Sequence, residues 1–158
     1  MLELLSPAGS MEALRAAVQN GANAVYLGYD QFNARMNAKN FSADELQEAI
    51  VYCHVRGVAV HLTLNTLVAD REMARAADVI RLAATLGVDA FIVQDLGMVQ
   101  LCREIAPEVA VHASTQMSIH SLEGVVAAAE LGCSRVVLSR ELPREEIAAI
   151  CRRSSFCG

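Results

Sequence analysis

The chain repeats one short unit six times: an apolar run, a small or polar turn, and a helical segment with one apolar stripe. The boundary between units is clearest where a glycine and a small polar residue precede the next apolar run, at 21–27, 87–93 and 132–138. Glycine ends a helix at low conformational cost, and the runs have the length of strands buried on both faces. Strands alternating with helices in this way predict a parallel sheet with right-handed crossovers.

Further strands are expected at 3–6, 58–64 and 109–113, with amphipathic helices between all six. Three local signals mark helix starts. Ser42 and Glu45 have the spacing of a capping box, Asp70 is expected to be an N-cap, and Pro143 is expected near the first turn of the last helix.

A closed parallel barrel needs about eight such units, and this chain has six. We therefore expect an incomplete parallel (β/α) barrel of the TIM type, forming one domain over residues 1–158. The sequence Pro7-Ala8-Gly9-Ser10 after the first strand lacks the glycine pattern of a dinucleotide-binding sheet, which disfavours the alternative of an open doubly wound fold. The first and sixth strands would expose unpaired edges, so we expect self-association or a partner chain that covers them.

Composition narrows the range of functions. A net charge of −5 argues against broad, nonspecific binding of nucleic acid. A chain with this net charge can still carry a local basic patch. No basic leader or bilayer-length apolar run is visible, so a soluble cytoplasmic protein without membrane contact is expected. The five cysteines form no C-x-x-C pair. Four are expected to be reduced thiols that act as small buried hydrophobic side chains, and the role of Cys157 is left open.

Polar residues follow the expected strands at corresponding places, where a parallel barrel carries its active site. At the fifth strand end, His112, Ser114 and Gln116 alternate, and they would share one face if the strand extends to Gln116. Asp95 and Glu141 are candidates for acid or base chemistry, and Arg140 for binding an anion or for pairing with Glu141. The structural alternatives are a core histidine, a serine cap and an ion-pair network around the rim.

His61, Thr63 and Asn65 alternate along the third strand and are expected to face the barrel interior, with His61 in a structural role. The sequence has no H-E-x-x-H zinc motif and no G-x-S-x-G elbow. His112 and Ser114 stand two residues apart on one strand, about 7 Å between Cα atoms, which is awkward for a direct hydrogen bond. The residues therefore give no support to peptidase chemistry.

Several segments together resemble the N-terminal part of the collagenase-like proteases, peptidase family U32. The resemblance covers nearly the whole chain, and its motifs follow the order found in the family. They are residues 3–9, 21–28, 32–35, 40–42, 64–66, 94–97, 112–116 and 139–142.

The resemblance implies two kinds of activity. The family's name records a protease, whereas several members resemble factors for oxygen-independent hydroxylation of RNA bases or of a quinone precursor, with an iron-sulfur cluster held by cysteines beyond the resembling region. We expect no cofactor or metal in this chain, and we expect the chain alone to be inactive. A noncatalytic binding or assembly module is the third alternative. The candidate catalytic residues are His112, Asp95 and Glu141, and the candidate contacts to a small-molecule, peptide or RNA substrate are Arg35, Asn65, Thr66, Gln94, Ser114, Thr115, Gln116 and Arg140.

Overall fold

The computed structural model describes residues 2–33 and 40–154. Its strands are β1 (Leu5–Pro7), β2 (Ala24–Gly28), β3 (Ala59–Leu64), β4 (Ala90–Val93), β5 (Ala110–Ala113) and β6 (Arg135–Val136). Its α-helices are α1 (Met11–Gln19), α2 (Ala43–His54), α3 (Met73–Leu86), α4 (Leu96–Ile105), α5 (Leu122–Glu130) and α6 (Arg144–Arg153), with short 3-10 helices over Asp70–Glu72 and Thr115–Met117.

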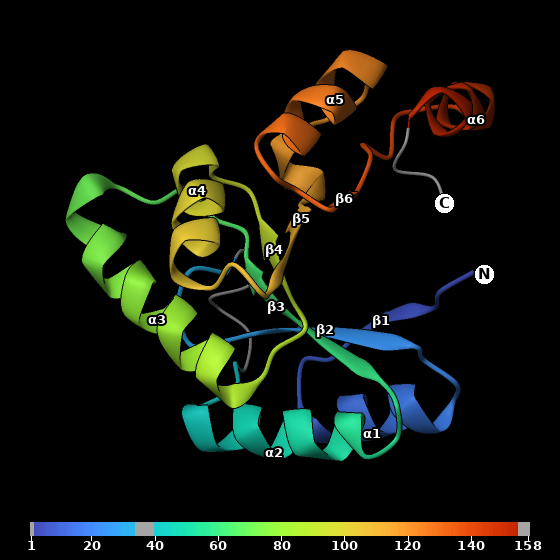
Figure 1. Cartoon of the computed structure of the whole chain (residues 1–158). Coiled ribbons are helices and arrows are strands. Elements are labelled where there is room, and N and C mark those ends of the chain that lie inside the picture. The colour runs from blue at the N-terminus through green and yellow to red at the C-terminus, as the bar shows by residue number, and fades with distance from the viewer. Residues whose placement is uncertain (1, 34–39, 155–158) are drawn as a thin grey trace.

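The six strands form one sheet in chain order, and every neighbouring pair is parallel. The helices follow the sheet as an arc around its outer side, and the arc is open between α6 and β1 (Figure 1). Sequential parallel strands with a helix after each are the wall of a (β/α) barrel. The predicted fold class, an incomplete TIM-type barrel of six units, is confirmed.

Alternation along each strand separates the two faces of the sheet. On β2, Val25 and Leu27 are buried against the helices, and Val60 and Leu62 do the same on β3. The residues between them face the inside of the barrel. Burying each such side chain is worth about 1.5–3 kcal/mol, so this layer between the sheet and the helices holds the wall together.

The helix-start predictions were partly right. The Ser42 hydroxyl accepts from the Glu45 amide at 3.3 Å and the Glu45 carboxylate accepts from the Ser42 amide at 3.0 Å, which is the expected capping box. Pro143 is the N-cap of α6. The prediction for Asp70 was wrong: a 3-10 turn begins there, and the Glu72 carboxylate accepts from the Ala69 amide at 2.9 Å.

Both edge strands differ from their predicted bounds. β1 begins at Leu5 and includes Pro7, which an edge strand tolerates because one side of it needs no donor. β6 is only two residues long although its apolar run is longer. Each of these strands has a single neighbour, and a 2.7 Å ion pair from Arg135 to Glu3 joins the two ends of the wall.

Cys53, Cys102 and Cys133 are buried as predicted, whereas Cys151 is only half-buried. His54, at the end of α2, is exposed and pairs with Asp89 at 2.9 Å. None of the helices in the described part of the chain has the length and apolarity needed to span a bilayer.

Candidate functional site

A hollow of about 650 Å³ lies where the strands end, and we call it the strand-end hollow. Side chains that follow the strands converge on it, as the sequence predicted for a parallel barrel. Its floor and walls are apolar near β1 and β4, and its rim is polar. The lining residues are Leu5, Pro7, Ala8, Gly9, Tyr26, Leu27, Gly28, Asn33, Asn40, Thr63, Asn65, Ile92, Ser114, Thr115, Gln116, Ser118, Val137, Ser139, Arg140 and Glu141.

Polar residues at the end of β3 and just after β5 line this hollow. Thr63 is the last inward residue of β3, and its hydroxyl donates to the Leu27 carbonyl at 3.0 Å. Asn65 directly follows the end of β3. Ser114 and Gln116 come after β5, and Ser114 is held there because its amide donates to the Val93 carbonyl at 2.8 Å. Six of the predicted site residues therefore lie together: Asn65, Ser114, Thr115, Gln116, Arg140 and Glu141.

Ser114 has both of the roles considered from the sequence. β5 ends at Ala113, and Ser114 is the N-cap of the following 3-10 helix, with its hydroxyl accepting from the Gln116 amide at 3.3 Å. The same side chain lines the hollow. Its hydroxyl is thus fixed by a local hydrogen bond, which suits a binding group better than a mobile nucleophile.

Two asparagines reach the hollow over the end of β2, and the sequence analysis did not select them. The Asn33 side-chain amide donates to the Tyr29 carbonyl at 2.5 Å and to the Asn40 side-chain oxygen at 3.2 Å. Gly28 leaves the space they occupy, since a Cβ there would stand 2.9 Å from the Asn33 Cγ and from the Asn40 oxygen. The signal for them was their position inside two of the resembling segments, at 32–35 and 40–42.

His112 lies on β5 toward the amino-terminal side of Ser114, so it sits beneath the hollow and is not among its lining residues. The residue is 6% exposed, and its ring meets the His61 ring edge to face, with centroids 4.9 Å apart. Burial, helped by His61 and Arg135, lowers the pKa of His112 to about 4, so the imidazole is neutral at pH 7. Burial also lowers the pKa of His61, whose Nδ1 has no hydrogen-bond partner among the described residues.

Asp95 has a defined local role. It is the N-cap of α4, where Oδ1 accepts from the Met98 amide at 3.1 Å and Oδ2 accepts from the Val68 amide at 3.3 Å. The carboxylate therefore ties the loop after β3 to the start of α4. Asp95, Thr66 and Gln94 are not among the lining residues of the hollow. Arg35 and Cys157 lie outside the described residues.

The described residues do not provide a metal centre. Across 2–33 and 40–154, no three histidine, cysteine or acidic side chains come together in a way that could hold an ion. Burial raises the pKa of the Cys53 thiol to about 11 and that of Cys102 to about 12, so both thiols are protonated at pH 7. Because the described cysteines do not gather into a group of three potential ligands, an iron-sulfur cluster does not fit them.

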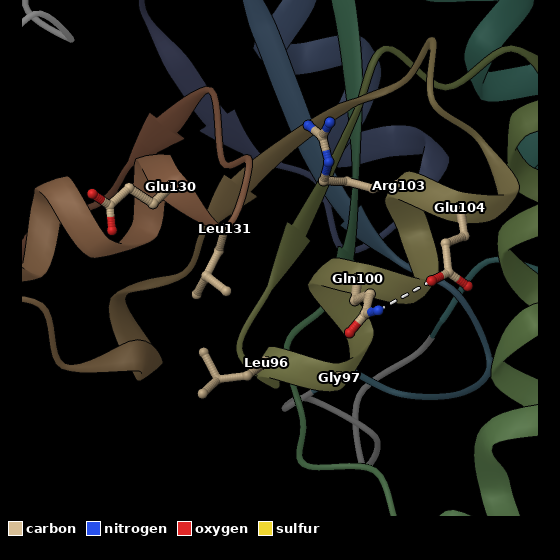
Figure 2. Close-up of a pocket in the computed structure, with 7 residues that line it drawn as sticks. All are labelled: Leu96, Gly97, Gln100, Arg103, Glu104, Glu130 and Leu131. Carbon is tan, nitrogen blue, oxygen red and sulfur yellow. Dashed lines mark hydrogen bonds between the residues drawn. The ribbon is translucent and has the colours of Figure 1, made fainter.

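A second hollow, of about 510 Å³, lies on the outer side of the barrel between α4 and α5 (Figure 2). The side-chain amide of Gln100 donates to Glu104 at 3.1 Å along its wall. Leu96 and Leu131 are partly exposed there, at 60% and 43%. It contains none of the candidate site residues predicted from the sequence, so we place the candidate site in the strand-end hollow.

The family model for peptidase family U32 matches residues 9–157. The chain belongs to this family. Three curated relatives of this U32 chain have different names. A Methanocaldococcus jannaschii protein named as an uncharacterized protease is 39% identical over 95% of this chain and 36% of its own length. The 23S rRNA 5-hydroxycytidine C2501 synthase of Escherichia coli is 40% identical over 94% of this chain and 22% of its own. The tRNA hydroxylation protein P1 of Bacillus subtilis is 37% identical over 92% of this chain and 34% of its own length.

The U32 chain thus spans between about a fifth and just over a third of the length of these relatives. Among solved structures, a U32 peptidase superposes with a TM-score of 0.77 at 17% identity, covering 98% of this chain and 66% of that one. At this identity the likeness concerns the fold, and it agrees with the architecture of the six-stranded wall.

Proposed function

We propose that this U32 chain forms the base-binding part of an enzyme that hydroxylates RNA. The observation that carries the proposal is the chemistry of the strand-end hollow, whose rim combines side-chain amides and hydroxyls over an apolar floor. An amide offers a donor and an acceptor side by side, which matches the hydrogen-bonding edge of a nucleobase. The apolar floor suits the face of a planar ring.

Peptidase chemistry has less support. A serine nucleophile needs a base within hydrogen-bond reach, and among the described residues the Ser114 hydroxyl accepts from the Gln116 amide but has no basic side chain as a hydrogen-bond partner. His112 lies below the hollow, and the Asp95 carboxylate caps α4. Two of the three relatives are named for RNA hydroxylation, and the third is named a protease.

In this proposal the chain's own residues bind and orient the base, and the redox chemistry comes from a group held elsewhere. Because the described cysteines do not fit a cluster, no hydroxylation step is assigned to them. The isolated chain is then expected to bind RNA without modifying it.

We also propose that the unpaired edges of β1 and β6 are covered in the functional protein, either by a second copy or by further polypeptide. Light scattering after size-exclusion chromatography tests this, and a monomer at every concentration of the isolated chain would exclude the second copy.

Fluorescence anisotropy of a labelled single-stranded RNA tests the main proposal. Gln116→Ala removes one rim amide and should weaken binding about fivefold, the effect of losing about 1 kcal/mol of hydrogen bonding. The matched control is Gln100→Ala, which removes an amide from the outer α4–α5 hollow and should leave RNA binding unchanged.

Two outcomes would contradict the proposal. Equal loss from both glutamine variants would mean that RNA contacts the surface generally and not the hollow. Cleavage of casein or collagen by the purified chain, abolished by His112→Ala or Asp95→Ala, would favour the peptidase alternative.

A further inference from the structure

Tyr26 differs in its surroundings from the other tyrosines of the chain. Tyr29 and Tyr52 pack against the hydrophobic core between sheet and helices, and Tyr26 does not belong to that core. It is an inward residue of β2, paired in register with Pro7 on β1 and with His61 on β3. Its side chain is half-buried and lines the strand-end hollow.

Within the described part of the chain, Tyr26 is the only phenylalanine or tyrosine ring that lines this hollow. The lining side chains around it are apolar on the floor, from Leu5 and Pro7 on β1 and Ile92 on β4. Phe32, Phe41 and Phe91 are all buried in the hydrophobic core and do not line the hollow. The floor therefore presents one aromatic ring beneath a rim of amides and hydroxyls.

We propose that Tyr26 is the stacking platform of the site, holding a planar heterocycle against its ring while the rim amides bind the edge. The inference rests on the proposed function and adds the residue that fixes the plane of the base. Aromatic side chains hold single-stranded bases by stacking, which does not depend on base identity because every base has a π-face. In this arrangement Tyr26 determines how strongly any base is held, and the rim determines which base is preferred.

The test compares three variants of the full chain by anisotropy, using a labelled single-stranded RNA of about ten nucleotides and a matched oligonucleotide with abasic sites. Tyr26→Leu should weaken RNA binding between about fivefold and a hundredfold, as expected for loss of one stacked base. Tyr26→Phe keeps the ring and should bind within about twofold of wild type. Tyr52→Leu changes a half-buried ring on α2 that does not line the hollow and is contacted by Arg15 and Arg56, and it should leave RNA binding unchanged.

The outcomes separate this inference from the proposed function. RNA binding by wild type that Tyr26→Leu leaves unchanged would overturn the stacking role while the RNA-binding proposal survives. An equal loss of binding to the abasic oligonucleotide would also overturn it, because no ring remains there to stack. If wild type binds neither oligonucleotide, both proposals fail together. Circular dichroism tests whether Tyr26→Leu is folded. If it is not, Tyr26→Phe decides the question, because a loss of RNA binding in a variant that keeps the ring would overturn the stacking role.

Discussion

His112 should make the stability of this chain strongly dependent on pH. Its imidazole is neutral in the folded state because burial, His61 and Arg135 lower its pKa to about 4, whereas in the unfolded chain the pKa is near 6.5. Between these values the unfolded state binds more protons than the folded state. Stability is therefore complete above about pH 6.5 and is lost as the pH falls toward and through 4.

The size of the effect follows from the two pKa values. The linkage relation gives a loss in the free energy of unfolding of about 2 kcal/mol between pH 7 and pH 5, rising to about 3 kcal/mol at pH 4. Such a loss is a large fraction of the stability of an ordinary domain. Carboxylates also titrate toward the acid end, so the contribution of His112 has to be isolated by substitution.

The assay is urea denaturation followed by far-ultraviolet circular dichroism at pH 7, 6 and 5. His112→Leu removes the titrating group and should flatten the pH dependence by about 2 kcal/mol over this range, whatever its effect on stability at pH 7. His120→Leu is the control, because the His120 ring is exposed and its removal should leave the wild-type slope. If His112→Leu and wild type lose stability in parallel, the reasoning about burial of this imidazole is refuted.

The described contacts also predict the outcome of three further substitutions. Gly28→Ala should lower RNA binding and cost about 1–3 kcal/mol of stability, because its Cβ would stand 2.9 Å from the Asn33 Cγ. Gly9→Ala, whose Cβ would meet nothing within 4 Å, is the control in the denaturation assay. Asp95→Ala should lower the free energy of unfolding by about 1–2 kcal/mol because it removes the cap of α4. Asp95→Asn should retain most of the stability, and equal losses from the two variants in thermal melts would contradict a capping role. Ser42→Ala should cost about 1 kcal/mol through the capping box of α2, and an unchanged urea midpoint would contradict it.

The local order of elements could be predicted from the sequence because short-range physics determines it. The helix-ending glycines, as at Gly87 with φ +93, and the alternation of apolar runs act over a few residues. The capping box at Ser42 is equally local. The prediction for Asp70 was wrong because a second acidic residue, Glu72, lies at the same helix start. The Glu72 carboxylate accepts the hydrogen bond from the Ala69 amide.

The site was predicted only in part, because proximity along a strand end does not say which way a side chain faces or what it binds. Asn65 lies in the hollow as alternation along β3 predicts. The alternation expected from His112 to Gln116 was wrong, because β5 ends at Ala113 and the residues Ser114, Thr115 and Gln116 line the hollow from the 3-10 turn that follows. Asp95 follows β4 in the same way, yet the nearby Met98 and Val68 amides engage its carboxylate.

The sequence by itself determined the repeating units, their parallel wall and the family, since each depends on patterns that recur along the chain. Only the tertiary structure placed His112 against His61 below the hollow, and only it set Asn33 and Asn40 over Gly28. These contacts join residues from different strands and loops. Their burial and orientation depend on how six strands twist into one curved wall, which no local pattern encodes.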